Sequence, residues 1–408
     1  MLELRSLTKE FGETVAVKAL NIACKERELL AIFGPAGAGK TTTLRLIAGI
    51  LKPTSGEVYF KGQPLMDVPP EWRNMSMVFE NYALYSHLSV YENLAFPLRA
   101  RRYPGDEIQR LVQRMAGILQ ISEMLDRRPG FLSGGQRQRV ALGRALIREA
   151  DVYLLDEPIS HLDAKLRHHM RGELKAICAE KEATVIHVTT DYREAMALAD
   201  RVAVLNKGRL MQLGTPGDIF QRPANEFVAG FVGDPPMSFM EVEYVQEDGQ
   251  PGFRIAESGI RLPASPEVGA YVKEKGLPDA FRLGARAVDV TVLPSADETH
   301  NVPGEVYVTE MFGHRNLLII KVGKSLVQVV TPSDLAFEVK DTVWLDLNQD
   351  NVHVFADGLA IAHARPKGSY SPSSTNLEAI RGGFSNARKA VEEVRESGGC
   401  VRDLPGDR

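Results

Sequence analysis

The most constraining feature of the sequence is a glycine-rich loop between an apolar run and an amphipathic segment. The apolar run LLAIF covers residues 29–33, the loop GPAGAGKT covers residues 34–41, and the helical pattern that follows carries Leu44, Leu46 and Ile47. A short, wholly apolar run is typical of a buried parallel strand. The spacing G-x-x-x-x-G-K-[ST] in a strand–loop–helix context predicts a phosphate-binding loop, and with it an α/β fold.

The residue types of this loop suit the binding of phosphates together with a magnesium ion. Glycines let backbone N–H groups curl around phosphate oxygens, and the N-terminus of the following helix adds a partial positive charge. We expect Lys40 to reach the β- and γ-phosphates and the Thr41 hydroxyl to hold Mg²⁺. The predicted phosphate-binding set is Gly34, Pro35, Ala36, Gly37, Ala38, Gly39, Lys40, Thr41 and Thr42.

A second apolar run, DVYLLDEP at residues 151–158, ends in two carboxylates. An acid at the C-terminal end of a buried parallel strand lies where open α/β sheets bind their ligands. We expect Asp156 to bind Mg²⁺ through water and Glu157 to polarise an attacking water. A strand-end Asp-Glu pair alone is more often a solvated turn. The phosphate loop earlier in the same chain favours the catalytic interpretation.

Length, charge and cysteine content narrow the class of protein. A chain of 408 residues suggests two or three domains. The net charge of −4 gives no global case for a nucleic-acid partner. The three cysteines match no metal or disulfide spacing, which favours a reducing cytoplasm. No stretch has the ~18 uninterrupted apolar residues of a membrane span, so we expect any work at a membrane to require a partner.

A long, ordered set of motifs resembles the ATP-binding-cassette (ABC) ATPases. The stretch LSGGQRQRVALGRALIREADVYLLDEP, at residues 132–158, is similar to the signature and the second nucleotide strand of that family. Three further stretches narrow the resemblance to the maltose-type carbohydrate-importer ATPase subunits: MVFENYALYSHLSVYENLAFPL (77–98), ISHLDAKLR (159–167) and PANEFVAGFVGDPPM (223–237). The resemblance covers residues 1 to about 360 and implies ATP and Mg²⁺ as cofactors.

The resemblance also implies a head-to-tail dimer, in which the signature of one subunit faces the γ-phosphate held by the other. We expect Ser133 to cap a helix whose first turn is Gly134, Gly135 and Gln136. Small residues there leave N–H groups open to an anion. Phe11, in LTKEFGE, stands where the family stacks an aromatic ring on adenine. Asp163, in ISHLDAKLR, completes the nucleotide-binding set that the resemblance implies.

Two residues depart from the family pattern around the same phosphate. Glu80, in MVFENYALY, replaces a glutamine that joins Mg²⁺ and the catalytic water to the membrane-docking surface. A carboxylate can contact Mg²⁺ but cannot donate a hydrogen bond. Its charge ~5 Å from the γ-phosphate oxygens would repel by roughly 3 kcal/mol per unit charge pair at an effective dielectric near 20. We therefore assign Glu80 both a metal-binding and a catalytic position.

The second departure is Thr190, in IHVTTD, where the family has a histidine that donates to the γ-phosphate. Loss of one aligned donor costs ~10²–10³ in rate in comparable sites. His187 lies three residues earlier in the strand, so we expect it to face away from Thr190, in the core or on the surface. The two changes together predict a subunit that binds ATP well and hydrolyses it slowly at its own site.

The chain divides into three predicted regions. Residues 1–235 form a nucleotide-binding domain with a helical subdomain at about 85–150. Residues 236–362 form an all-β, OB-like regulatory barrel, because FRIAESGIRL, ARAVDVTVL, LLIIKVG, SLVQVV and DTVWLDL are short alternating runs. LGARAVDV in this region lacks the family's usual Pro-Glu pair. Residues 363–408 are expected to form a linker and a partly helical or disordered tail.

The resemblance implies an ATPase subunit that energises an importer for a carbohydrate or polyol-type solute, at the cytoplasmic face of the inner membrane. The implied partners are two integral-membrane permease subunits, docked through residues 80–92, and a second ATPase subunit, identical or different. A periplasmic or extracellular solute-binding protein is an indirect partner, and no nucleic acid is expected. Two alternatives stay open: a binding-only, regulatory pseudo-ATPase, and a soluble ABC protein without a transporter.

Overall fold

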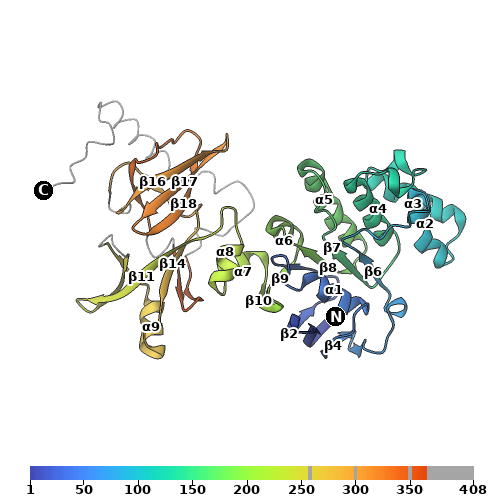
Figure 1. The fold of residues 1–408 in the computed structure, drawn as a ribbon, viewed down its shortest axis with the longest axis horizontal. Coiled ribbons are helices and arrows are strands. Elements are labelled where there is room, and N and C mark those ends of the chain that lie inside the picture. The colour runs from blue at the N-terminus through green and yellow to red at the C-terminus, as the bar shows by residue number, and fades with distance from the viewer. Residues whose placement is uncertain (256–259, 298–300, 348–351, 365–408) are drawn as a thin grey trace. The chain divides into compact units, whose positions relative to one another are not determined.

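The computed structural model describes residues 1–255, 260–297, 301–347 and 352–364 (Figure 1). The chain divides into two compact units, of which the first is Met1–Gly217 and the second begins at Asp218. The domain boundaries near residues 235 and 362 stay predictions. The predicted tail lies, from residue 365 on, outside the described residues.

The first unit is built on a six-stranded sheet with the order β10-β9-β3-β8-β7-β6. Strands β9, β3, β8, β7 and β6 run in parallel, and β10 pairs antiparallel with β9. Strands β3, β7 and β8 are mostly apolar and are wholly buried, because both faces of the sheet are covered. The strands are β3 (Leu29–Phe33), β6 (Met75–Val78), β7 (Val152–Asp156), β8 (Thr184–Thr189), β9 (Arg201–Asn206) and β10 (Arg209–Gly214).

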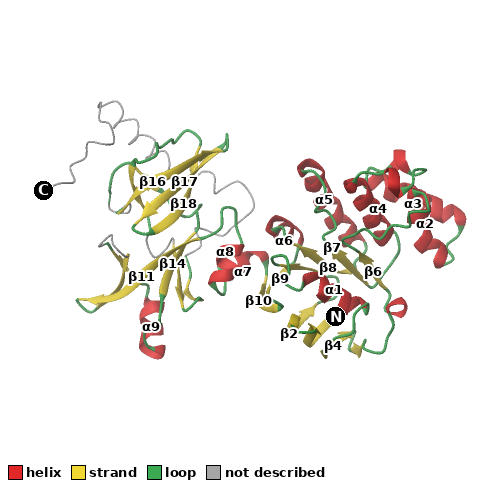
Figure 2. Ribbon diagram, in the orientation of Figure 1, coloured by secondary structure: helices red, strands yellow, loops and turns green. Residues whose placement is uncertain are grey.

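Helices from the chain segments between these strands cover the sheet (Figure 2). Helix α1 (Lys40–Ala48) packs against β7 and β8, and α6 (Tyr192–Leu198) packs against β3 and β8. Helix α5 (Ala164–Glu180) contacts α6. The predicted apolar residues of the first helix are all buried there: Leu44, Leu46 and Ile47.

An antiparallel sheet with the order β2-β1-β4-β5 accompanies the parallel sheet and shares a hydrophobic core with α1. Two of its strands come from residues 1–30, and two later strands complete it. Its members are β1 (Leu2–Phe11), β2 (Thr14–Cys24), β4 (Ser55–Phe60) and β5 (Gln63–Pro64). A short 3₁₀ turn, η1 (Pro70–Trp72), leads from this sheet to β6.

The chain between β6 and β7 is mainly helical, and the bounds of the helical subdomain at about 85–150 stay a prediction. Helix α3 buries Ile108, Val112 and Met115, at the spacing of one helix face. Helix α3 thus covers most of the stretch IQRLVQRMAGILQI, residues 108–121, whose apolar residues recur at helical spacing. The elements are α2 (Val90–Ala100), α3 (Gly105–Ile118), η2 (Ser122–Met124), η3 (Pro129–Phe131) and α4 (Gly134–Leu146).

The second unit is dominated by two antiparallel sheets that share one core, an OB-like, β-rich architecture. Their orders are β13-β12-β11-β14-β20-β21 and β15-β19-β16-β17-β18. The strands are β11 (Ser238–Glu247), β12 (Gln250–Ile255), β13 (Arg261–Pro263), β14 (Phe281–Ala285), β15 (Val292–Leu293), β16 (Val302–Met311), β17 (Arg315–Val322), β18 (Ser325–Pro332), β19 (Thr342–Leu345), β20 (Val352–Ala356) and β21 (Leu359–Ala362).

Two local features of this unit differ from the sequence-based expectation. The stretch ARAVDVTVL is a strand only at its two ends, because Arg286 turns away from the sheet and donates to Phe220 O and Val232 O. Among the described residues of this unit are the helices α8 (Glu226–Phe231) and α9 (Pro266–Lys275), and α7 (Pro216–Gln221) lies at its start. No helix within the described residues is long and apolar enough to cross a membrane.

Candidate active site

The phosphate loop connects the C-terminal end of β3 to α1, and two of its glycines are required by close backbone approaches. A Cβ at Gly34 would lie 2.3 Å from Leu205 O, and a Cβ at Gly39 would lie 2.3 Å from Ala16 O. Gly39 also has a φ of 96°, a conformation that side chains disfavour. The loop is therefore held between β9 and β2, and Ala36 at its tip is exposed.

The lysine and threonine at the start of α1 both reach toward polar groups of the site. Lys40 is buried, and its Nζ donates to Pro35 O at 2.9 Å. Burial lowers the pKa of Lys40, while the carboxylates of Glu157, Asp156 and Glu80 oppose that effect. Thr41 Oγ1 donates to Asp156 Oδ1 at 3.0 Å. The structure thus joins the phosphate loop to the end of β7.

Burial and neighbouring carboxylates raise the pKa values of the two acids at the end of β7. Asp156 is 1% exposed, and burial raises its pKa to about 6, with further raising contributions from Glu80 and Glu157. Burial also raises the pKa of Glu157; Lys40 lowers it, and Glu80 raises it again. The extra carboxylate at position 80 therefore acts on both acids of the predicted catalytic pair.

The donor set around Asp156 fits a magnesium ion that is bound together with nucleotide phosphates. Asp156 Oδ2 is buried without a hydrogen-bond partner, while its other oxygen accepts from Thr41. Mg²⁺ prefers oxygen ligands and is usually held by one or two carboxylates plus substrate phosphates. Within the described part of the chain, no group of three His, Cys, Asp or Glu side chains could hold a metal alone. Phosphate oxygens would therefore supply the remaining ligands.

His187 lies within β8, and Thr190 is the first residue after that strand. Thr190 is exposed, and its side chain is hydrogen-bonded to Glu157. His187 is 1% exposed, and its Nε2 lies 3.4 Å from Glu194 Oε2, which is also buried. His187 is therefore a core residue away from Thr190, as the strand geometry predicts.

The signature residues form a fully closed helix cap at the start of α4. Ser133 Oγ accepts from Gln136 N at 3.3 Å, and Gln136 Oε1 accepts from Ser133 N at 2.8 Å. This reciprocal pair is a capping box. Gly134 and Gly135 make the first turn, and a Cβ at Gly135 would lie 3.2 Å from Leu162 Cδ2. The signature turn thus lies against the loop that follows Glu157.

The two remaining predicted nucleotide residues lie on the surface. Phe11 ends β1, is 48% exposed, and has Lys9 Nζ 5.0 Å from its ring centroid. An exposed aromatic face of this kind can stack on a base. Asp163 is exposed and caps α5, because its Oδ1 accepts from Leu166 N at 2.9 Å. The structure thus adds a capping role to the nucleotide-binding role predicted for Asp163.

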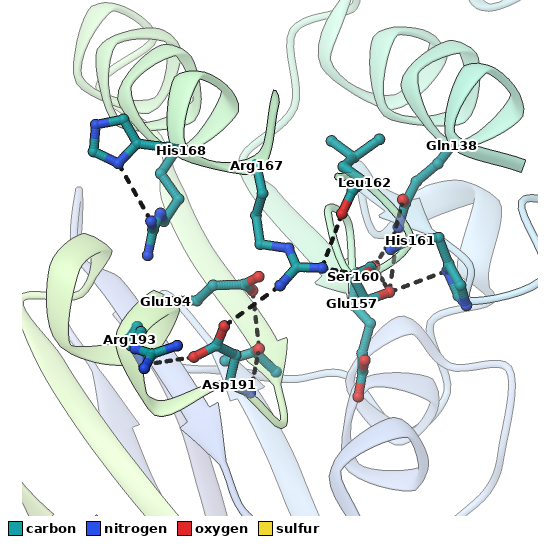
Figure 3. A network of polar contacts seen from close by, with 12 residues as sticks. Gln138, Glu157, Ser160, His161, Leu162, Arg167, His168, Asp191, Arg193 and Glu194 are labelled. Carbon is teal, nitrogen blue, oxygen red and sulfur yellow. Dashed lines mark hydrogen bonds and ion pairs between the residues drawn. The ribbon is translucent and has the colours of Figure 1, made fainter. Parts of the chain in front are cut away.

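The sequence analysis misses Gln138, which reaches from α4 to the backbone of Glu157 (Figure 3). Its Nε2 donates to Glu157 O at 2.8 Å, and its Oε1 accepts from His161 N at 3.1 Å. A sequence signal exists, because Gln138 occupies the same helix face as the buried Leu142 and Ala145. A polar residue on an otherwise apolar stripe indicates a buried hydrogen-bonding role.

Arg167 is a second residue that the sequence analysis misses in the surroundings of Glu157. It donates to Ser160 O and Leu162 O, both at 2.9 Å, and its Nη1 lies 3.9 Å from Asp191 Oδ2 (Figure 3). The loop after Glu157 and the segment after β8 are therefore linked by one guanidinium.

This fold and this site define a P-loop nucleotide hydrolase: a phosphate loop after β3, an acidic pair at the end of β7, and a capped glycine turn before it. The comparisons with known proteins make the class specific. The family model described as ABC transporter matches residues 17–160. The trehalose/maltose import ATP-binding protein MalK of Thermococcus litoralis is 41% identical over 369 residues, covering 87% of this chain and 97% of that protein.

Other relatives are also ATP-binding proteins of transport systems. The multiple sugar-binding transport ATP-binding protein MsmK of Streptococcus mutans is 38% identical and covers 87% of this chain and 97% of its own length. The sn-glycerol-3-phosphate import ATP-binding protein UgpC of Pectobacterium atrosepticum is 37% identical with the same coverage. A solved dimer of the ATP-binding cassette MJ0796 with ADP and phosphate has a TM-score of 0.50 and 31% identity, over 53% of this chain and 99% of that one. The chain belongs to the ABC transporter family, among the maltose-type importer ATP-binding subunits, and is a transport ATPase.

Proposed function

We propose that the chain energises an importer for a carbohydrate or polyol-type solute, as one of a pair of ATPase subunits at the cytoplasmic face of the membrane. Three relatives support the solute class, because their names refer to trehalose or maltose, to multiple sugars and to sn-glycerol-3-phosphate. The partners are two permease subunits, which select the solute with a solute-binding protein. Co-purification of the chain with two membrane subunits tests this assignment.

Within one subunit, the proposed chemistry uses the phosphate loop and the ends of β7 and β8. Lys40 and the N–H groups of the loop bind the β- and γ-phosphates. Thr41 and Asp156 hold Mg²⁺, which when bound neutralises phosphate charge. Glu157 accepts a hydrogen bond from the attacking water and orients its oxygen toward the γ-phosphorus. The new P–O bond forms as the bond to the bridging oxygen breaks; ADP leaves, and the proton of the water passes by way of the Glu157 carboxylate to the phosphate product.

The proposal that this subunit hydrolyses ATP slowly at its own site rests on Glu80 and Thr190. Burial is the largest cause that raises the pKa of Asp156 and of Glu157, and the charge of Glu80 raises both further. A more basic Glu157 is protonated more of the time and then cannot accept from water. The hydrogen bond from Thr190 engages the same carboxylate that must hold the water. Both changes act on Glu157, and the phosphate loop around Lys40 keeps every residue type of its motif.

We infer that the chain pairs with a second, differently equipped ATPase subunit. In a head-to-tail pair, each composite site takes its phosphate loop, its Glu157 position and its position 190 from one subunit, and its signature from the other. The complete capping box of Ser133 and Gln136 supports this division. The chain would supply an ordered signature to its partner's site. Its own site would bind ATP, hydrolyse it slowly and so hold the two subunits together. A homodimer, with Glu80 and Thr190 in both sites, is the alternative.

The test compares single-turnover ATP hydrolysis by the isolated chain, by its Glu80→Gln/Thr190→His double variant, and by the native complex. We expect weak hydrolysis by the isolated chain and a recovery of about tenfold or more in the double variant, because one restored donor is worth ~10²–10³ in comparable sites. We also expect two kinds of ATPase subunit in the complex. Rapid hydrolysis by the unmodified chain as a homodimer would overturn the slow-site proposal and leave the importer assignment standing.

A further inference from the structure

Glu157 has a backbone conformation that a residue with a Cβ disfavours, so neighbouring groups must hold it in place. Its φ is 47°, in the left-handed region. Its N–H donates to Val188 O at 3.0 Å, which ties it to β8. Its carbonyl oxygen accepts from Gln138 Nε2 at 2.8 Å and from Ser160 Oγ at 3.1 Å. The direction of the Glu157 side chain therefore depends on contacts made by its own peptide groups.

Gln138 makes the shorter of these carbonyl contacts, and its amide holds the turn at two points. The residue is 2% exposed. While Nε2 donates to Glu157 O, Oε1 accepts from His161 N at 3.1 Å, so one planar amide spans the turn from residue 157 to residue 161 (Figure 3). A buried amide of this kind is costly to leave unpaired, which gives the arrangement a single preferred geometry.

The side chain of Gln138 extends from a helix that is packed into the core, so its amide is held firmly. Its helix begins directly after Ser133, and neighbouring residues Val140 and Leu142 are fully buried in the core of the helical subdomain. The atoms of a side chain on a packed helix are positioned more precisely than those of a side chain on a loop. Ser160 is the weaker support, because it belongs to the same turn as Glu157 and its hydroxyl is shared with His161 Nδ1 at 3.1 Å.

We propose that Gln138 is a positioning residue for ATP hydrolysis, which holds the backbone of Glu157 so that its carboxylate is aimed at the attacking water. The inference rests on the proposed role of Glu157. Gln138 touches neither phosphate nor metal in this role and acts through Glu157 alone. Its loss should therefore slow the hydrolytic step and leave ATP binding, which uses Lys40 and the phosphate loop, unchanged.

Two substitutions at this position separate the hydrogen bonds. Gln138→Met keeps the length of the side chain and removes both polar groups. Gln138→Glu keeps an acceptor for His161 N and removes the donor to Glu157 O. Gln113→Met is the matched control, because Gln113 is exposed on α3. Each variant is measured in the full chain for its single-turnover hydrolysis rate and, separately, for its ATP dissociation constant by calorimetry.

We expect both Gln138 variants to hydrolyse ATP about 10- to 100-fold more slowly, the cost of a small misplacement of a reacting group. Their ATP dissociation constants should match that of Gln113→Met. Ser160→Ala, which removes the second donor to Glu157 O, should show the same pattern with a smaller loss. If Gln138→Met does not fold, Gln138→Glu and Ser160→Ala decide the matter, with thermal unfolding as the check on each.

Unchanged hydrolysis in the folded Gln138 variants, or an equal loss of affinity and rate, would overturn the inference. Glu157→Gln distinguishes this failure from a failure of the proposed function. If Glu157→Gln abolishes hydrolysis while the Gln138 variants stay active, the positioning role alone is wrong. If Glu157→Gln hydrolyses ATP normally, the assignment of Glu157 is wrong, and the positioning role falls with it.

Discussion

The Thr190 side chain is hydrogen-bonded to the carboxylate of Glu157, across the ends of two neighbouring parallel strands. Burial raises the pKa of Glu157, and this hydrogen bond opposes the rise. The residue at position 190 therefore affects the ionisation of Glu157 as well as the surroundings of the γ-phosphate. A histidine at this position would donate from a longer and sometimes charged side chain.

Thr190→Val should shift the acid limb of the pH–rate profile to higher pH. Valine has nearly the same shape but no hydroxyl, so the contribution that lowers the pKa of Glu157 disappears, and the carboxylate protonates more readily. Thr190→Ser keeps the hydroxyl and is the control. Hydrolysis rates measured between about pH 5 and pH 8 check the shift. An identical acid limb in all three proteins would contradict the role of this hydrogen bond.

Lys40→Ala should abolish tight binding of Mg-ATP, because the phosphates lose their main cation. The side chain is buried and close enough to Asp156, Glu157 and Glu80 to feel their charges. Lys273→Ala, an exposed lysine of the second unit, serves as the control for loss of one charge. Calorimetric titration with ATP measures both affinities. An unchanged affinity for Lys40→Ala would remove the phosphate-loop assignment.

Asp156 should make the nucleotide-free protein less stable as the pH rises from about 4 to about 6. Burial raises the pKa of Asp156 from 3.8 to about 6, so the folded protein holds this proton more tightly than the unfolded chain does. Stability is highest below the unfolded pKa and falls as the pH passes through the folded pKa; the full effect is on the order of 3 kcal/mol. Asp156→Asn removes the titrating group.

The measurement is the thermal unfolding midpoint of both proteins across this pH range. The midpoint of the unmodified protein should fall relative to Asp156→Asn, and excess Mg-ATP should offset the loss because it binds the folded state. Parallel midpoint curves for the two proteins would show that Asp156 ionises in the folded protein as it does in the unfolded chain.

Tyr85→Asp should uncouple ATP hydrolysis from transport without unfolding the subunit. Tyr85 lies in the segment predicted to dock on the permease, is 36% exposed, and packs against the exposed Phe96 of α2 with ring centroids 4.8 Å apart. Trp72→Asp is the control, since Trp72 is also an exposed aromatic but lies outside the segment. Solute uptake per ATP hydrolysed, measured in vesicles with the complete importer, should fall only for Tyr85→Asp. Equal coupling in both variants would place the docking surface elsewhere.

The sequence predicts the features of this protein that depend on local backbone chemistry. The strand–loop–helix around Lys40, the cap at Ser133 and the acidic end of β7 each require residue types at fixed short spacings, and the structure contains all three. Position along a strand also separates His187 from Thr190, because alternate side chains face opposite sides. Such features need no knowledge of distant parts of the chain.

Features that depend on distant contacts are not predicted. Gln138 becomes significant only when α4 packs beside the turn after β7, 19 residues later. The stretch ARAVDVTVL alternates like a strand, yet Arg286 donates to carbonyl groups 66 and 54 residues earlier in the chain.

Helix α9 is missed for a different reason. It has a local signal, Ser265 followed by Pro266 and Glu267, which indicates a helix start. The apolar residues of α9 keep helical spacing over only a short stretch, and strand-like stretches precede and follow it. The sequence pattern therefore does not single out this helix.

The hydroxyl of Ser133 is used as an acceptor inside the capping box, so its proton remains free to be donated outward. One atom thus contributes to the folding of α4 and offers a hydrogen bond to an anion at the helix end. The two contributions can be separated by mutation, because an ionised aspartate accepts the capping hydrogen bond as well as serine does but has no proton to donate. Ser133→Ala will therefore carry a penalty in protein abundance that Ser133→Asp avoids, and suppressors that restore stability elsewhere will recover the amount of the alanine variant without recovering its activity.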